Sequence, residues 1–166
     1  MDIEKKRARI AKVAGRNGWS VVVLGGLCLA GSLLEFSVAG ILVCLAALAS
    51  GCMELSGRRR LKQNRPEAGR WLAGSQLLLL VAVILYSVSQ LLLLDPNEIM
   101  MHLSDLRQAM DPNDLKKLIV RVIHILYPLV IAGTVLFQGG LWLYYTRATR
   151  KLEQAAAEES QGKMKT

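Results

Sequence analysis

Long apolar stretches alternate with short charged ones along the chain. Charged residues gather at 1–16, 54–70, 95–121 and 146–166, and the stretches between them are almost free of charge. About 20 consecutive apolar residues form a helix that can cross a hydrocarbon core of about 30 Å. The pattern therefore predicts an all-α integral membrane four-helix bundle, forming a single membrane domain over residues 1–166.

The first apolar stretch, residues 19–53, is expected to contain two spans. As one helix it would measure about 52 Å, which is too long for one crossing. Glu35 lies near its middle, so we predict a tight turn within 31–37 and a close antiparallel hairpin, with a re-entrant hairpin as the alternative. The four predicted spans are 19–34, 36–53, 71–94 and 118–145. The last span is long enough to tilt or protrude, and Pro128 is the place where it could bend.

Lys and Arg residues are distributed unevenly between the two sides of this topology. Seventeen of the 21 lie in the N-terminal segment, the 54–70 loop and the 146–166 tail, and four lie on the other side. Cytoplasmic loops carry an excess of Lys and Arg. Trp19, Trp71 and Trp142 fall at the same predicted inner boundary, where aromatic residues favour the interface. We therefore expect a multi-pass protein of the cell (inner) membrane with both termini in the cytoplasm, although organelle membranes share these signals.

The loop between the third and fourth spans predicts a short outer amphipathic helix over about 97–110. Four apolar residues form one stripe on it: Ile99, Leu103, Leu106 and Met110. An Asp-Pro-Asn sequence precedes this helix at 95–97 and recurs at 111–113, and both copies are typical of helix starts. We expect the stripe to pack on the membrane or the bundle. A docking face for a partner and a substrate lid are the alternatives.

Polar side chains within the third and fourth spans lie on one face of each helix, a pattern that we call the polar seam. Its members are Gln76, Ser87, Gln90, Arg121, His124, Tyr127, Thr134 and Gln138. Polar groups in hydrocarbon need partners, so we expect hydrogen bonds between these two spans, with a polar path or small-molecule site as the alternative. Glu35 and Arg121 lie at matching levels near the outer ends of their spans. A further hypothesis therefore pairs these two charges or places them in one polar network.

Composition adds little chemistry to this picture. The chain is 52% hydrophobic with a mean hydropathy of +0.33, whereas soluble domains are about 45–50% apolar. Cys28, Cys44 and Cys52 lie in apolar stretches and are expected to be packing residues. The sequence has no HExxH, P-loop, GxGxxG or nucleophile-elbow motif. We therefore expect no enzyme activity, no metal site and no cofactor.

Three functional classes follow from this layout. The expected one is an accessory, assembly or interaction subunit that acts through helix–helix contacts, with the lipid bilayer and a protein partner or a homo-oligomer around it. The alternative is an oligomeric small transporter or channel subunit whose polar seam lines a path. An enzyme that uses His124 and Arg121 is the third. The basic runs EKKRARIAK and GRRRLKQNR are expected to enforce topology, with anionic lipid, RNA or an acidic protein as alternative ligands. We expect no nucleic acid partner.

Overall fold

The computed structural model describes residues 3–65, 67–93, 95, 99 and 111–164, with side chains as far as residue 155. Its helices are α1 (Ile3–Leu34), α2 (Val38–Lys62), α3 (Ala68–Leu93) and α6 (Pro112–Met164). The described residues contain no strand, and the predicted all-α four-helix bundle is confirmed. Apart from Ile99, the predicted outer helix, with Leu103, Leu106 and Met110, lies outside the described residues.

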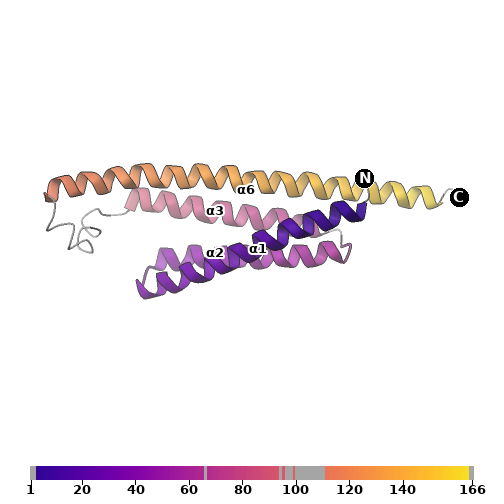
Figure 1. Ribbon diagram of the computed structural model, residues 1–166, viewed down its shortest axis with the longest axis horizontal. Coiled ribbons are helices and arrows are strands. Elements are labelled where there is room, and N and C mark those ends of the chain that lie inside the picture. The colour runs from indigo at the N-terminus through magenta and orange to yellow at the C-terminus, as the bar shows by residue number, and fades with distance from the viewer. Residues whose placement is uncertain (1–2, 66, 94, 96–98, 100–110, 165–166) are drawn as a thin grey trace.

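The helices form two antiparallel hairpins that lie side by side (Figure 1). One hairpin is α1 with α2, the other is α3 with α6, and α2 packs against α3 between them. The start of α1, the connection from α2 to α3 and the last part of α6 lie at one end of the bundle (Figure 1). We call this the basic end, because residues 3–16, 54–70 and 146–164 carry 16 of the 21 Lys and Arg residues.

The connection between α1 and α2 is a tight turn of residues 35–37, as the sequence predicts. Its backbone is closed by the amide of Ser37, which donates to the carbonyl of Ser32 at 3.0 Å, and Phe36 takes a positive φ of 52°. The Ser37 hydroxyl then accepts from the amide of Gly40 at 3.2 Å and caps α2. The two helices are thereby reversed within three residues.

Helix α6 begins where the second Asp-Pro-Asn sequence predicts a start. The Asp111 carboxylate accepts a hydrogen bond from the amide of Asn113 at 2.8 Å, and Pro112 occupies the first helical position. Pro128 lies within the helix, which continues unbroken through it to Met164. This single helix therefore contains both the fourth predicted span and most of the predicted tail.

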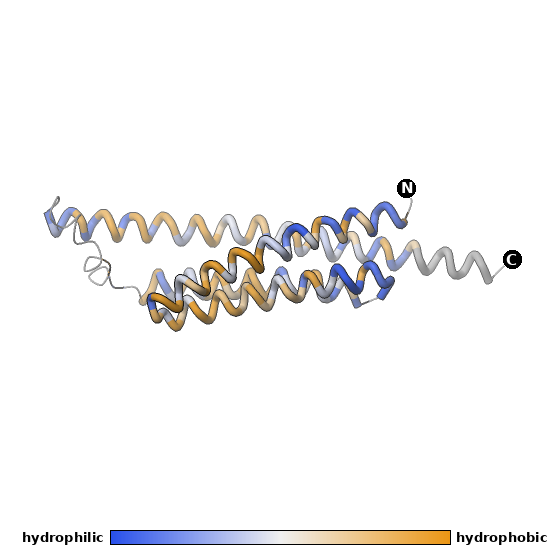
Figure 2. Tube along the Cα trace, turned by 60° about the horizontal axis from the view of Figure 1, so that its bottom comes forward, coloured by the Kyte–Doolittle hydropathy of each residue, from blue (hydrophilic) through white to orange (hydrophobic). Residues whose placement is uncertain are grey.

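Four helices are long and apolar enough to cross a membrane, which is the layout of a multi-pass membrane protein. Apolar residues gather in the middle of the bundle, and hydrophilic ones gather toward the ends (Figure 2). Large apolar side chains such as Leu27, Leu85 and Leu136 are more than 60% exposed, an arrangement that suits contact with lipid. At 1.5 Å per residue, α1 is about 48 Å long and α6 about 80 Å, so both extend beyond a hydrocarbon core of about 30 Å.

The buried apolar residues form two clusters near opposite ends of the bundle. The larger lies at the basic end and draws on all four helices: Ile10, Ala11, Ala14, Leu61, Ala68, Leu72, Tyr145 and Leu152. The smaller consists of Leu115, Ile119 and Ile123 of α6, with half-buried Leu91, Ile99 and Tyr127 against it. Close packing of α1 against α6 is thus concentrated at the basic end.

Candidate functional site

A buried carboxylate ties three helices together beside the larger cluster. Glu54 of α2 is fully buried, and each of its two oxygens accepts one hydrogen bond. The Asn17 side-chain amide of α1 donates to Oε2 at 2.7 Å, and the Tyr145 hydroxyl of α6 donates to Oε1 at 2.5 Å. A buried carboxylate is costly unless its oxygens are hydrogen-bonded, so these two donors offset much of that cost.

Near this carboxylate the backbones of neighbouring helices lie close together. A Cβ added to Gly51 would lie 3.1 Å from the Gly18 carbonyl oxygen and 3.2 Å from the Val22 amide nitrogen, so only glycine allows this contact between α1 and α2. On the other side, the buried Ser50 hydroxyl donates to the Ser75 carbonyl of α3 at 2.7 Å. Small residues permit such approaches in lipid, where burial of apolar area provides little drive. The basic end is therefore closed by both packing and hydrogen bonds.

Sequence reasoning did not single out Glu54, although a signal for it exists. The small residues of α2 fall at 40, 44, 47 and 51, with spacings of four, three and four. The next step of three on the same face reaches 54, so this carboxylate continues the face that packs against α1. Because Glu54 was grouped with the charged loop 54–70, its position on the α1-facing side of α2 was not predicted.

Away from the basic end the two hairpins separate and leave a groove of about 870 Å³. The groove follows α1 from Asn17 to Glu35 and is walled on the other side by α3 and α6. Most of its lining is apolar. Its polar lining includes Ser32, Cys44, Tyr86, Ser87, Tyr127 and Gln138.

Two polar side chains of the groove are buried without partners. Ser87 of α3 is fully buried and Gln138 of α6 is 8% exposed. Within the part of the chain that the structure describes, the Ser87 hydroxyl and the Gln138 side-chain oxygen have no hydrogen-bond partner. Leaving such a group unsatisfied costs about 1–3 kcal/mol. Native proteins contain few of these groups, so a pair of them facing one groove marks it as a candidate binding site.

The structure divides the predicted polar seam into three parts. Ser87, Tyr127 and Gln138 meet at the groove. Gln76 is buried near the basic end, where its amide donates to the Ser75 hydroxyl at 3.3 Å and its oxygen has no partner. The remaining members are half-buried or exposed outside the groove: Gln90, Thr134, Arg121 and His124.

Hydrogen bonds between the third and fourth spans were expected for the seam, and Ser87 and Gln138 do not form them. His124 is exposed, and its Nδ1 lies 2.9 Å from the Val120 carbonyl of the preceding turn. The polar seam was assigned from the faces of ideal helices taken one at a time. Because the two hairpins separate, residues on one such face have different neighbours.

The predicted ion pair between Glu35 and Arg121 is not formed in this structure. The ion pairs found among the described residues are Arg60 with Glu67 and Lys117 with Asp114. Glu35 lies in the turn of the first hairpin at one end of the groove, and Arg121 is exposed on α6. The hairpins diverge toward this end, so matching depth in the sequence does not bring the two charges together.

Of the predicted outer stripe, only Ile99 belongs to the described residues. It is half-buried and packs against the cluster of Leu115, Ile119 and Ile123. This contact agrees with bundle packing for that position, and the other three members of the stripe remain a prediction.

Comparison with protein-family models, with curated proteins and with solved structures finds no match for this chain. Among the described residues, no group of three or more His, Cys, Asp or Glu side chains is placed to hold a metal ion. The groove with its unpaired Ser87 and Gln138 is therefore identified from this chain's own geometry alone.

Proposed function

We propose that this chain is an accessory or assembly subunit of a membrane complex, and that it receives a transmembrane helix of another protein in the groove between its hairpins. The observation that carries the proposal is the pair of buried unpaired groups, Ser87 and Gln138, on one groove wall. Both oxygens are covered by the chain itself, so a partner helix with a polar side chain at that depth would pair with them after neighbouring side chains shift. Interhelical hydrogen bonds of this kind stabilise helix association in membranes.

The length of the groove suits such an occupant. Asn17 and Glu35 mark its two ends along α1 and are 18 residues apart, which corresponds to about 27 Å of helix. A spanning helix crosses about 30 Å of hydrocarbon. An apolar groove of this length with two polar anchors matches the helix-in-groove mode of recognition.

We also propose that the basic end faces the cytoplasm of a cell inner membrane, with both termini on that side. The support is the charge distribution, because Lys and Arg favour cytoplasmic segments and 16 of the 21 belong to the basic end. Labelling of single cysteines placed at positions 5 and 97 by an impermeant reagent would test it. Labelling of position 5 in intact cells would contradict this orientation.

The partner proposal is tested by affinity purification in mild detergent with two matched double variants. Ser87→Ala with Gln138→Leu removes the polar anchors of the groove. Ser89→Ala with Gln90→Leu makes the same chemical changes outside the groove lining. We expect a stoichiometric foreign partner with the natural chain and the control, and its loss with the groove variant. Recovery of a self-oligomer alone, or of the partner with all three chains, would contradict the proposal.

A second candidate function is an oligomeric small transporter or channel subunit. One observation favours it: the groove carries polar groups along its length, from Asn17 through Ser87 and Tyr127 to Glu35. In a chain without its native cysteines, cysteine labelling by a water-soluble reagent would compare positions 127 and 138 of the groove with 126 and 136 on the exposed face. Transport requires the first pair to react. If neither groove position is reachable from water, the transporter function is excluded.

A further inference from the structure

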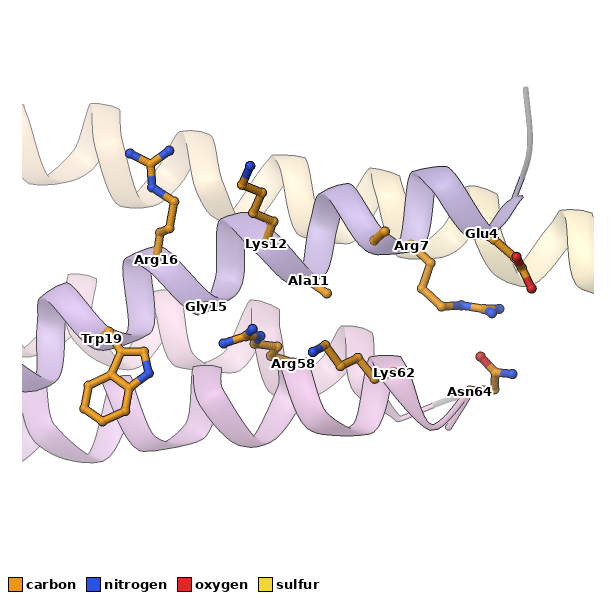
Figure 3. A pocket seen from close by; sticks show the side chains of 11 residues that line it. Glu4, Arg7, Ala11, Lys12, Gly15, Arg16, Trp19, Arg58, Lys62 and Asn64 are labelled. Atoms are coloured by element: carbon orange, nitrogen blue, oxygen red, sulfur yellow. The ribbon is translucent and has the colours of Figure 1, made fainter.

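The basic end contains a second cavity, a cleft of about 790 Å³ along the contact between α1 and α2 (Figure 3). Small residues of α1 form part of its lining at spacings of three and four, namely Ala8, Ala11 and Gly15. Residues three and four apart lie on one face of a helix. The sequence of α1 therefore leaves a shallow trough along the face that meets α2.

Five cations surround this cleft. Arg7, Lys12 and Arg16 come from α1, whereas Arg58 and Lys62 come from α2. Figure 3 shows Arg58 and Lys62 extending from α2 beside α1, whereas Lys12 and Arg16 extend from α1 on the side away from α2. None of the five belongs to either ion pair found among the described residues. Glu4 is the acidic residue of the lining, so the cleft has a large excess of positive charge.

Gly15 and Arg58 form the centre of the cleft. A Cβ at Gly15 would lie 2.5 Å from Nη1 of Arg58 and 2.7 Å from its Cζ, so the guanidinium rests directly against the glycine. The Nε of Arg58 is buried and has no hydrogen-bond partner. Arginine presents a rigid set of donors that matches phosphate geometry. The guanidinium is thus held against α1, and because its Nε is covered, an anion in the cleft would meet its terminal nitrogens.

The surroundings of the cleft indicate where that anion comes from. Trp19 closes the cleft on the side toward the apolar middle of the bundle (Figure 3). Val23 and Leu27 follow on the same face at steps of four and are more than half exposed. Tryptophan favours the head-group level of a membrane. A head group in the cleft would therefore continue into acyl chains that lie along Val23 and Leu27.

We propose that this cleft binds the phosphate head group of an acidic phospholipid. Basic pockets between helices at the membrane surface are suited to such head groups, and each nearby Lys or Arg strengthens binding about fivefold. A nucleic acid or an acidic peptide would use the charges but would leave the apolar track below Trp19 without a role. The lipid assignment uses both features of the surface.

The test measures quenching of Trp19 fluorescence in vesicles. The full chain with Trp71→Phe and Trp142→Phe keeps Trp19 as its one tryptophan. It is reconstituted in phosphatidylcholine that contains an increasing fraction of either brominated phosphatidylglycerol or brominated phosphatidylcholine. We expect phosphatidylglycerol to quench at a clearly lower fraction. Equal quenching by the two lipids would overturn the proposal without any variant in the cleft.

Three further chains separate the cleft from general surface charge. Arg58→Gln with Lys62→Gln removes two cleft cations, and the preference for phosphatidylglycerol should fall about thirty-fold. Arg9→Gln with Arg59→Gln removes two exposed cations of the same helices outside the cleft, and the preference should persist. Gly15→Ala keeps every charge but displaces the Arg58 guanidinium, so the preference should weaken.

Two results would contradict this assignment. An equal loss in the cleft variant and in the exposed control would show that total charge, and not the cleft, attracts the lipid. Displacement of the brominated lipid by millimolar inorganic phosphate would show that the cleft serves a soluble phosphate ligand instead of a lipid.

Discussion

The basic end and the groove are built from the same four helices, yet their central polar groups differ in pairing, although Arg58 and Gln76 at the basic end also keep one unpaired atom each. At the basic end, Glu54 receives one donor for each oxygen, from Asn17 and Tyr145. In the groove, Ser87 and Gln138 are buried with unpaired oxygens. Apolar packing follows the same division, since the cluster that joins all four helices lies at the basic end.

The contrast distinguishes polar groups that stabilise the fold from polar groups that are available for binding. Hydrogen bonds that close within the chain contribute to folding, whereas buried groups left open cost free energy until another molecule pairs with them. The basic end thus holds the hairpins together, and the groove is free to receive an occupant.

Removal of the Glu54 carboxylate should produce the largest loss. Glu54→Ala leaves the Asn17 amide and the Tyr145 hydroxyl buried without their acceptor, and should lower the free energy of unfolding by about 3 kcal/mol. Titration with dodecyl sulfate in mixed micelles measures it. Glu153→Ala, at an exposed site on α6, is the control and should change little. Equal stability of the two variants would refute the role of Glu54 as an anchor.

A methyl group at Gly51 should have the next largest effect. Its Cβ would press on the backbone of Gly18 and Val22, which cannot move as a side chain can, so Gly51→Ala should cost about 2 kcal/mol. Gly133→Ala on α6 meets nothing within 4 Å and should be neutral or stabilising by up to about 1 kcal/mol. The same unfolding titration compares them. A loss at position 133 as large as that at 51 would contradict the close helix contact assigned to Gly51.

Replacing a buried serine by alanine should change the free energy of unfolding in opposite directions in the two regions. Ser50→Ala breaks the hydrogen bond to the Ser75 carbonyl and should destabilise by about 0.5–1 kcal/mol. Ser87→Ala removes an unpaired buried hydroxyl and should stabilise the isolated chain by about the same amount. Unfolding of both variants in the same detergent measures the difference. A loss of stability with Ser87→Ala would mean that the groove is already closed by the chain itself.

The smallest effect is expected at the surface of the basic end. Arg60 lies 2.6 Å from Glu67 and 4.4 Å from the ring centroid of Trp71, and both members of the ion pair are at least partly exposed. Arg60→Ala should cost about 0.5–1 kcal/mol, and the part due to the ion pair should fade in high salt. Unfolding at low and high ionic strength measures it. A loss of stability larger than that of Glu54→Ala would contradict the expectation that the buried charge contributes more than the surface charge.

Much of the fold can be predicted from the sequence, because hydropathy patterns and helix caps depend on residues close together in the chain. The charge-free stretches predict four helices, Glu35 marks the first turn, and Asp111 with Pro112 marks the start of α6. These features depend on residues within one or two turns of each other. The lengths of the helices were harder to predict. The basic residues before Trp19 are helical and extend α1 beyond the predicted span.

The site was only partly predictable, because it depends on how the two hairpins sit against each other. Of the predicted polar seam, Ser87, Tyr127 and Gln138 line the groove, whereas Gln90, Thr134 and His124 lie outside it. Helical wheels give directions within one helix and no information on where two helices diverge. The pairing of Asn17, Glu54 and Tyr145 likewise joins residues 37 and 91 positions apart, and no local pattern connects them.

Photo-crosslinking within the native membrane tests whether the groove binds a partner helix. A photoreactive amino acid is placed at position 83, which lines the groove, or at position 81, which is exposed on the same helix. We predict one adduct with a single polypeptide from position 83, absent when Ser87→Ala and Gln138→Leu are combined, and lipid adducts alone from position 81. Lipid adducts alone from both positions would contradict the account.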